Sequence, residues 1–499
     1  MENRFNLVDE PWIPITDYGR VSLRDIFSHR HYKSLGGNPI QKIAVFKLLL
    51  AIAQAAATPA DEAEYNQLGA QGLSEKCLDY LESWHDRFYL YGNNPFLQMP
   101  AISNARALSF GAFLPEVATG NTTLLTQYQM EKQLSDADKA ILLLLQMGFA
   151  LGGKKTDNRV VLSKDYMGKS NAKGKPSTGK PGPSVAHMGL LHHFVMTTHL
   201  QDSVWLNLLS SQEIESIGMY SAGVGQAPWE QMPKGEACET AQRLKDSYMG
   251  RLIPLCRFCL LTEDSMHYSE GIAHAGYREG VHDLSVAVDY SGKDPRAQWT
   301  DPEKKPWREL TALLGFIEQA DSKGFQSWQI RLGLDKARDT YPLFSIWSSG
   351  LKVSSNAGEQ YVSGSDDFVE SQIWLESAVL GEAWFEQLKQ EMGELDTLAK
   401  TLYGRVLAYF KAFTVDGKNT AVMAKNLFWQ LCERDFQSLI YHCGSTEENR
   451  KQRQILRHRF ASYQHQAYDC FCANQTARQL DAWVKNRPNH YKYLIREAS

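Results

Sequence analysis

The sequence has no excess of positive charge: 53 lysines and arginines face 57 aspartates and glutamates, which gives a net charge of −4. A protein that coats nucleic acid over its whole surface needs a basic balance, so that class is excluded, although a local basic surface is still allowed. Long apolar runs are also lacking. The longest that we identify, Ala140–Leu151, is interrupted by Gln146 and falls short of the roughly 20 residues that span a bilayer. We therefore expect no membrane partner.

Cysteine is scarce, with eight in 499 residues, which is too few for a disulfide-based scaffold in a chain of this length. Residues Met1–Glu10 do not form a basic segment followed by an apolar one, so we expect no secretory signal, reduced thiols and a cytoplasmic location. Hydrophobic residues make up 43% and charged residues 22%, which excludes global disorder. At roughly 100–200 residues per domain, the length predicts two or three domains.

The N-terminal part alternates short strand-like and helical segments. Pro11 and Pro14 lack backbone donors and favour an extended chain, and a turn follows at Tyr18 and Gly19. We expect a hairpin of Val8–Ile15 and Arg20–Leu23, then helices over Ile40–Ala57, Glu75–Phe88 and Asp136–Leu151. This mixture predicts a mixed α/β N-terminal domain over residues 1–370.

The character of the chain changes after about Ser371. From Trp384 to Phe413, apolar residues recur at spacings of three and four, which is typical of one face of a helix pair or of one bent helix. Further apolar stripes follow, and proline is absent until Pro488. We expect an all-α four-helix bundle over residues 371–499, and hence an α+β chain.

Positive charge is concentrated in Gly152–Lys180, which holds eight basic and two acidic residues in a chain of net charge −4. Lysines near phosphates release counterions, and glycines allow the backbone to approach a groove closely. We interpret this segment as a phosphate-contacting loop; a solvated loop without a ligand is the alternative. The candidate DNA-binding residues are Lys154, Lys155, Lys169, Lys173, Lys175 and Lys180.

A second basic run lies on a predicted helix, where Arg450, Arg453 and Arg457 share a face. A solvated helix face and a contact with nucleic acid or a partner protein are both compatible with this pattern. The run therefore stays an open alternative.

Two groups of residues could support metal chemistry. His187, His192, His193 and His199 form the densest histidine cluster, but no accompanying carboxylate spacing is present and the setting is largely apolar. Cys256 and Cys259 form a single C-x-x-C, whereas a structural zinc site usually needs a second pair. We expect hydrogen-bonded structural histidines and no bound metal or other cofactor; zinc and a metal-dependent nuclease or other hydrolase are the alternatives.

The order of several motifs resembles a known family. Leu7–Pro14 reads Leu-Val-Asp-Glu-Pro-Trp-Ile-Pro, and Asn94–Gln98 reads Asn-Pro-Phe-Leu-Gln. A segment Val204–Leu209 and then Pro228-Trp229-Glu230 follow in matching order. The chain resembles, over essentially its whole length, the CasA large subunits of the type I-E CRISPR surveillance complex, Cascade. The resemblance implies a non-catalytic subunit with a mixed N-terminal domain and a helical bundle.

The resemblance also implies roles for individual residues. In this family one loop docks near the 5′ handle of the CRISPR RNA (crRNA), and the similar segment here contains Asn121 and Thr122. The region that reads the protospacer-adjacent motif (PAM) corresponds to Gly182 and Ser184, followed by His187 to Gly189, together with Lys293. The wedge that opens the first base pair falls on Asn356 and Ala357, with Gln360 as the rival position.

The implied partners are crRNA, double-stranded target DNA, the backbone, crRNA-handle-binding and small subunits of Cascade, and a separate helicase-nuclease. Base pairing with the guide would read the target, while this chain would read the short PAM and help to open the duplex. A scaffold that binds only protein partners is a further alternative.

Overall fold

The structure, a computed structural model, describes residues 2–113, 133–150, 187–272, 274, 282–317, 325–352, 355–356, 359–360 and 367–495. The chain forms two compact units. Unit 1 comprises Met1–Pro306, Lys323–Thr340 and Ser345–Gln372, and unit 2 comprises Trp307–Ser322, Tyr341–Phe344 and Ile373–Ser499. The predicted boundary at residues 370 and 371 lies close to the last passage between the units. Unit 2 additionally contains two short segments from earlier in the chain.

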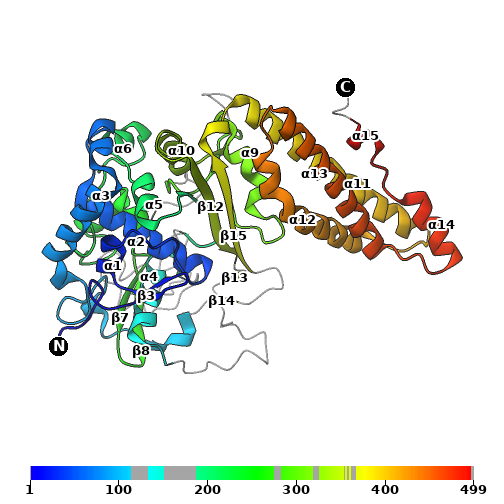
Figure 1. Ribbon diagram of the computed structural model, residues 1–499. Coiled ribbons are helices and arrows are strands. Elements are labelled where there is room, and N and C mark those ends of the chain that lie inside the picture. Colours follow the sequence, from blue (N-terminus) through cyan, green and yellow to red (C-terminus); the bar gives the residue numbers. More distant parts are fainter. Residues whose placement is uncertain are drawn as a thin grey trace. The chain divides into compact units, whose positions relative to one another are not determined.

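Helices and antiparallel sheets mix in unit 1, whereas unit 2 is mainly helical, so the predicted α+β class is confirmed (Figure 1). The helices of unit 1 are α1 (Leu23–Ser28), α2 (Pro39–Ala57), α3 (Glu62–Ser83), α4 (Asp136–Gly148), α5 (Leu200–Asn207), α6 (Ser211–Ile217), α7 (Glu239–Lys245), α8 (Met249–Leu252) and α10 (Trp328–Thr340). Those of unit 2 are α9 (Leu310–Leu313), α11 (Glu382–Lys411), α12 (Lys418–Tyr441), α13 (Glu447–Phe471), α14 (Ala477–Asn486) and α15 (Tyr491–Leu494).

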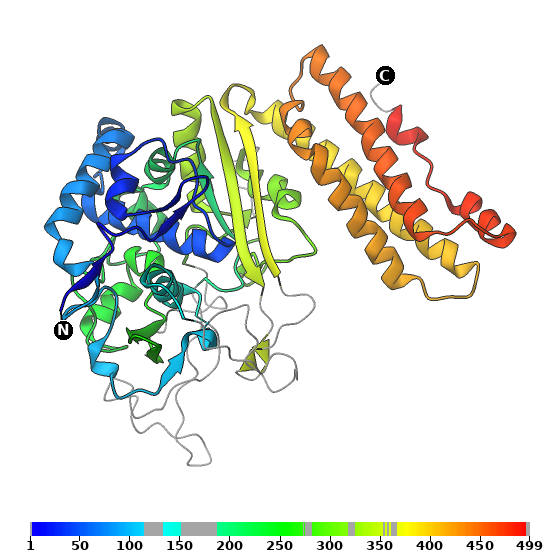
Figure 2. The same ribbon diagram turned by 60° about the horizontal axis from the view of Figure 1, so that its bottom comes forward.

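The strands form small sheets. Two-stranded sheets pair β1 (Arg4–Asn6) with β4 (Tyr89–Tyr91), β2 (Ile13–Ile15) with β3 (Gly19–Val21), and β13 (Ser355–Asn356) with β14 (Glu359–Gln360). Three-stranded sheets have the orders β5 (Ala107–Ser109), β8 (Ser265–Glu270), β7 (Arg257–Leu261); β15 (Asp367–Glu376), β12 (Leu343–Lys352), β6 (His192–Met196); and β10 (Arg296–Ala297), β9 (Val288–Asp289), β11 (Phe325–Gln326). Figures 1 and 2 show β12 and β15 as two long neighbouring strands.

The predicted N-terminal hairpin is present as β2 and β3, which pair Ile13 with Val21. The predicted helix Ile40–Ala57 is α2, whose N-terminus is capped by Asn38 with Gln41 in a reciprocal capping box. By length and composition α2 could cross a membrane, a property that the apolar runs of the sequence did not indicate. Most of it is buried in the core of unit 1, because apolar residues cover nearly all its faces.

An aromatic cluster joins α2 to the sheet that contains β6 and β12. Phe46 of α2 makes an edge contact with Phe194 of β6, and their ring centroids are 4.9 Å apart. Phe194 in turn stacks on Trp347 of β12, its directly paired partner across the antiparallel ladder. These contacts fix α2 against the strand that begins at His192.

Unit 2 is built around the long helices α11, α12 and α13, with α14 packed against α11 (Figure 1). The apolar stripe predicted from Trp384 onward is buried along a single helix, α11, and its last member, Phe413, lies just beyond the helix end. The stripe therefore forms the inner face of one helix and not of a helix pair.

Candidate nucleic-acid interface

Many of the residues predicted to contact nucleic acid lie outside the described part of the chain. These are Asn121, Thr122, Lys154, Lys155, Lys169, Lys173, Lys175, Lys180, Gly182, Ser184 and Ala357. Lys293, Asn356 and the segment that begins at His187 are described, so the geometry of the candidate site rests on them.

Gly148, at the end of α4, and His187 lie in direct contact. The His187 backbone N–H donates to the Gly148 carbonyl at 3.1 Å. A Cβ added at Gly148 would lie 2.0 Å from the His187 ring, so this close approach requires glycine. The described residues on either side of segment 151–186 are therefore held together at one point of unit 1.

His187 belongs to a buried polar cluster built from distant parts of the chain. The Lys47 ammonium, on α2, donates to both carboxylate oxygens of Asp283, at 2.8 and 3.1 Å. His187 Nδ1 lies 3.3 Å from Asp283 Oδ2. Asp283 Oδ1 also accepts from the backbone N–H and the hydroxyl of Ser285, and His192 Nδ1 lies 2.9 Å from that hydroxyl oxygen. Asp283 is the acceptor around which the cluster is organised.

The charge state of the cluster follows from these contacts. Burial alone would raise the pKa of Asp283, but the Lys47 ammonium and His187 hold it well below its usual range, so the carboxylate is ionised. Burial, together with Lys47, depresses the pKa of His192. The cluster thus contains one buried cation–anion pair surrounded by imidazoles.

Three of these side chains have the spacing of metal ligands. The nearest ligand atoms of His187, His192 and Asp283 all lie within 4.8 Å of one another. However, the Lys47 ammonium already contacts both oxygens of Asp283, so the positive charge opposite the carboxylate is supplied by the protein. The sequence pattern indicated His187 and His192 but missed Lys47 and Asp283. The only sign of these two residues in the sequence was that Lys47 lies inside the apolar run Ile40–Ala57.

The other histidines of the sequence cluster do not join this group. His193 Nε2 donates to Gln298 Oε1 at 3.0 Å, so His193 Nδ1 accepts from the Ser348 hydroxyl at 2.8 Å. Burial lowers the pKa of His193 to about 4. His199 lies instead beside Asp202, with 3.6 Å between Nδ1 and Oδ2. His193 has the geometry of a neutral, hydrogen-bonded structural histidine, as the sequence analysis expected.

The cluster leads directly into the elements that carry Gly189 and Lys293. The His193 N–H donates to Ser285 O at 2.7 Å, and the Thr300 N–H donates to Gly189 O at 2.8 Å. Residues 189–193 therefore form hydrogen bonds with the chain just before β9 and just after β10. Lys293 is exposed in the turn between β9 and β10.

Gly189 occupies a position where a larger residue does not fit. Its φ of +80° lies in the left-handed region, and an added Cβ would lie 2.8 Å from Cζ3 of Trp299. The Trp299 side chain is 51% exposed. The Gly189 backbone and the partly exposed Trp299 ring thus lie side by side, next to the buried cluster.

Asn356 ends the first strand of a short hairpin. It pairs with Glu359, and Ser355 pairs with Gln360, in an antiparallel ladder between β13 and β14. Asn356 is thus the last residue of β13, whereas the rival position Gln360 is the last residue of β14. An antiparallel strand pair is thus present where the wedge is expected, and which residue acts as the wedge stays a prediction.

Cys256 and Cys259 are both buried, and burial raises the pKa of the Cys259 thiol. Neither belongs to a group of three or more potential metal ligands among the described residues. Two histidines that follow the cysteines in sequence contact backbone carbonyls: His267 Nδ1 lies 2.7 Å from Ala105 O, and His274 Nε2 lies 2.6 Å from Pro254 O. The described geometry around the two thiols is therefore that of core cysteines.

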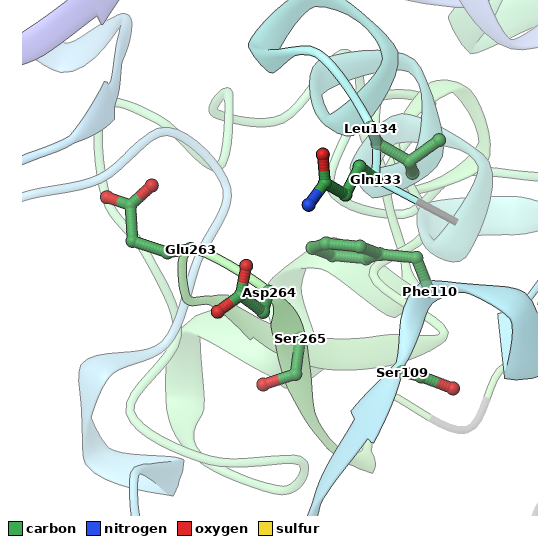
Figure 3. A pocket seen from close by; sticks show the side chains of 7 residues that line it. All are labelled: Ser109, Phe110, Gln133, Leu134, Glu263, Asp264 and Ser265. Carbon is green, nitrogen blue, oxygen red and sulfur yellow. The ribbon is translucent and has the colours of Figure 1, made fainter. Parts of the chain in front are cut away.

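A cavity of about 730 Å³ lies at the turn between β7 and β8. Figure 3 shows Phe110 and the carboxylates of Glu263 and Asp264 among the side chains that line it. Arg4 donates to Glu263 at 2.7 Å, so one of the two carboxylates is already paired. An acidic lining does not suit a phosphate backbone, and we do not assign this cavity to the nucleic-acid interface.

The arginines of α13 that share a helical spacing do not form an exposed basic face. Arg457 is 1% exposed and forms two hydrogen bonds, of 2.6 and 3.1 Å, with the buried Glu391 carboxylate of α11. Arg453 is also buried and donates to the carbonyls of His442 and Gly444. Of the three arginines predicted to share an outward face, only Arg450 is exposed. Sequence periodicity did not reveal this because the acidic partner lies 66 residues away.

Comparisons with known proteins give a consistent result. The sequence matches the family described as CRISPR-associated protein Cse1 over residues 6–467. CasA/Cse1 of Thermus thermophilus is 32% identical over 164 residues, which are 30% of this chain and 32% of that protein. The match thus spans about a third of that relative's length.

Solved structures share the fold over nearly the whole chain. Thermus thermophilus CasA has 19% identity and a TM-score of 0.72, and the match covers 98% of this chain and 99% of that one. Thermobifida fusca Cse1 has 16% identity and a TM-score of 0.75, with coverages of 99% and 98%. A chain solved in a CRISPR RNA-guided surveillance complex has 14% identity and a TM-score of 0.65, with coverages of 97% and 98%.

Proposed function

Because the chain belongs to the CRISPR-associated Cse1 family, we propose that it is the large, non-catalytic subunit of a type I-E RNA-guided surveillance complex, Cascade. The family match over residues 6–467 is the observation that carries this proposal. The shared fold with a chain from a surveillance complex supports it. The proposed partners are crRNA, the backbone, crRNA-handle-binding and small subunits, target DNA, and a helicase-nuclease that this subunit helps to recruit.

We assign the first contact with duplex DNA to the basic segment. Lys154, Lys155, Lys169, Lys173, Lys175 and Lys180 would neutralise phosphates without regard to sequence. Gly182, Ser184 and Lys293 would sample the PAM, where a minor-groove approach favours backbone groups and flexible cations. The exposed position of Lys293 in the β9–β10 turn supports this role.

Duplex opening would begin at the β13–β14 hairpin. Asn356 and Ala357 would intrude at the base step next to the PAM, at a cost of a few kcal/mol for unstacking, offset by growth of the RNA–DNA heteroduplex. Asn121 and Thr122 would contact the 5′ handle of the crRNA. In this mechanism the chain binds and distorts DNA, and a separate enzyme cuts it.

A salt titration of the reconstituted complex tests the DNA contact. Replacing Lys169, Lys173 and Lys175 by alanine should weaken duplex binding about equally for all sequences and reduce the slope of log K against log salt by about one per lysine. As the control, Lys400, Lys451 and Lys485 are replaced, since all three are exposed on unit 2 and paired within their own helices.

Two results would contradict the proposal. One is equal salt slopes for the two triple variants, which would leave the basic segment without a role in DNA binding. The other is metal-dependent cleavage of DNA by the purified chain, abolished by chelation, which would favour the metal-dependent nuclease.

A further inference from the structure

The Lys47–Asp283 ion pair is buried, and burying an ion pair has a free-energy cost. The Lys47 side chain is 2% exposed and that of Asp283 is 8% exposed. Taking two charges out of water costs several kcal/mol per ion, and well-packed apolar residues are often as stabilising as a buried ion pair. Stability alone therefore gives no strong reason for this pair, and a role in fixing one local geometry is the better-attested use of such pairs.

The geometry fixed by the pair is visible in the bonds of Asp283. One carboxylate accepts from the ammonium of α2 and from both the N–H and the hydroxyl of Ser285, and it lies 3.3 Å from Nδ1 of His187. Asp283 therefore links the buried helix α2 to two segments that lead to the surface. One begins at His187 and reaches Gly189 two residues later; the other runs from Ser285 into β9 and the turn that carries Lys293.

The two segments are also tied to each other, so a shift of one moves the other. His192 forms an isolated bridge with Val286, and the His193 N–H donates to Ser285 O. Leu190, Val286 and Val288 pack in one small buried cluster with Ala297. Close packing of this kind passes a displacement on and does not absorb it.

We propose that Lys47, Asp283 and His187 form a clamp that holds the Gly189 segment and the Lys293 turn in one fixed relation, so that the two can read a short duplex motif together. Lys47 and Asp283 are positioning residues in this scheme, since both are buried and neither touches DNA. The inference rests on the proposed function and adds to it the residues that set motif discrimination.

A paired replacement separates positioning from simple stability. Lys47→Met with Asp283→Asn removes both charges, keeps an amide oxygen that can accept from Ser285, and leaves no buried ion unpaired. The full-length double variant is reconstituted into the complex and given a pool of target duplexes with randomised positions beside the target. Sequencing of the bound fraction then gives the preference for each flanking motif.

We expect the double variant to bind duplex DNA as well as the natural chain, but to lose roughly tenfold in preference for the favoured motif, within the range of coupling effects in packed networks. The matched control is Arg257→Met with Glu270→Gln. It removes a buried ion pair of 3.1 Å between β7 and β8 and should leave the preference unchanged.

The outcomes distinguish the clamp from the proposed function. If the natural complex shows no preference for any flanking motif, PAM reading itself fails. If it shows one and the double variant keeps it, the clamp is overturned. Should the double variant fail to assemble, His187→Gln provides the second test, because it removes the ring nitrogen that lies 3.3 Å from Asp283 Oδ2 and leaves the Lys47–Asp283 pair in place. An unchanged preference there would again reject the clamp.

Discussion

The hydrogen bonds of a buried histidine determine its protonation state, and His193 is an example. His193 donates through Nε2 and accepts through Nδ1, which only a neutral imidazole can do. Burial lowers the pKa of His193 to about 4 and that of His274 to about 3. In the unfolded chain both imidazoles return to an ordinary pKa near 6.5. Folding therefore expels protons from these sites below about pH 6.5.

The sign of the resulting pH dependence is fixed. Between about pH 6.5 and 4 the unfolded chain binds more protons than the folded chain, so the free energy of unfolding falls as the pH falls. Each such histidine contributes up to about 1.4 kcal/mol per pH unit. Denaturant titrations at pH 7, 6 and 5 should show this loss, and His193→Gln should flatten it. A slope unaffected by His193→Gln would refute the assignment.

At the scale of elements, the helices with an uninterrupted apolar pattern could be predicted and the contacts between distant segments could not. The periodicity from Trp384 and the dense apolar run from Ile40 are local signals, and both became the helices expected. Asp283 gave no signal, because its partner Lys47 is 236 residues away. The spacing of Arg457 wrongly indicated an exposed basic face, because a buried arginine bonded to Glu391 has the same helical spacing as an exposed one.

The β13–β14 hairpin is the element on which duplex opening depends in our proposal. Asn356→Ala should leave the initial binding of target duplex intact and reduce permanganate reactivity of thymines next to the PAM, because the side chain that unstacks the first step is lost. Gln360→Ala is the matched change at the far end of the paired strand. Loss of reactivity in the Gln360 variant alone would move the wedge to that position, and full reactivity in both would remove it from this hairpin.

On the scale of the whole molecule, the chain passes between its two units more than once, which a boundary drawn at one residue does not capture. Trp307 precedes most of unit 2 by more than 60 residues but packs within it: its ring centroid lies 4.3 Å from that of Phe436 and 5.8 Å from that of Trp429. The described part of this early segment thus supplies core to the bundle. The helices after Ile373 do not bury their aromatic residues unaided.

A fragment of residues 373–499 should therefore be less stable than the same helices in the full chain. Without Trp307, the rings of Phe436 and Trp429 lose a buried partner, and tryptophan-to-alanine changes in protein cores cost about 3–5 kcal/mol. Hydrogen exchange of α12 in the fragment, in the full chain and in full-length Trp307→Ala isolates this contribution. We expect the substitution to reproduce most of the protection lost in the fragment, whereas Trp299→Ala, at a half-exposed ring, should have little effect. Full protection of α12 in the fragment would show that the bundle closes its core without Trp307.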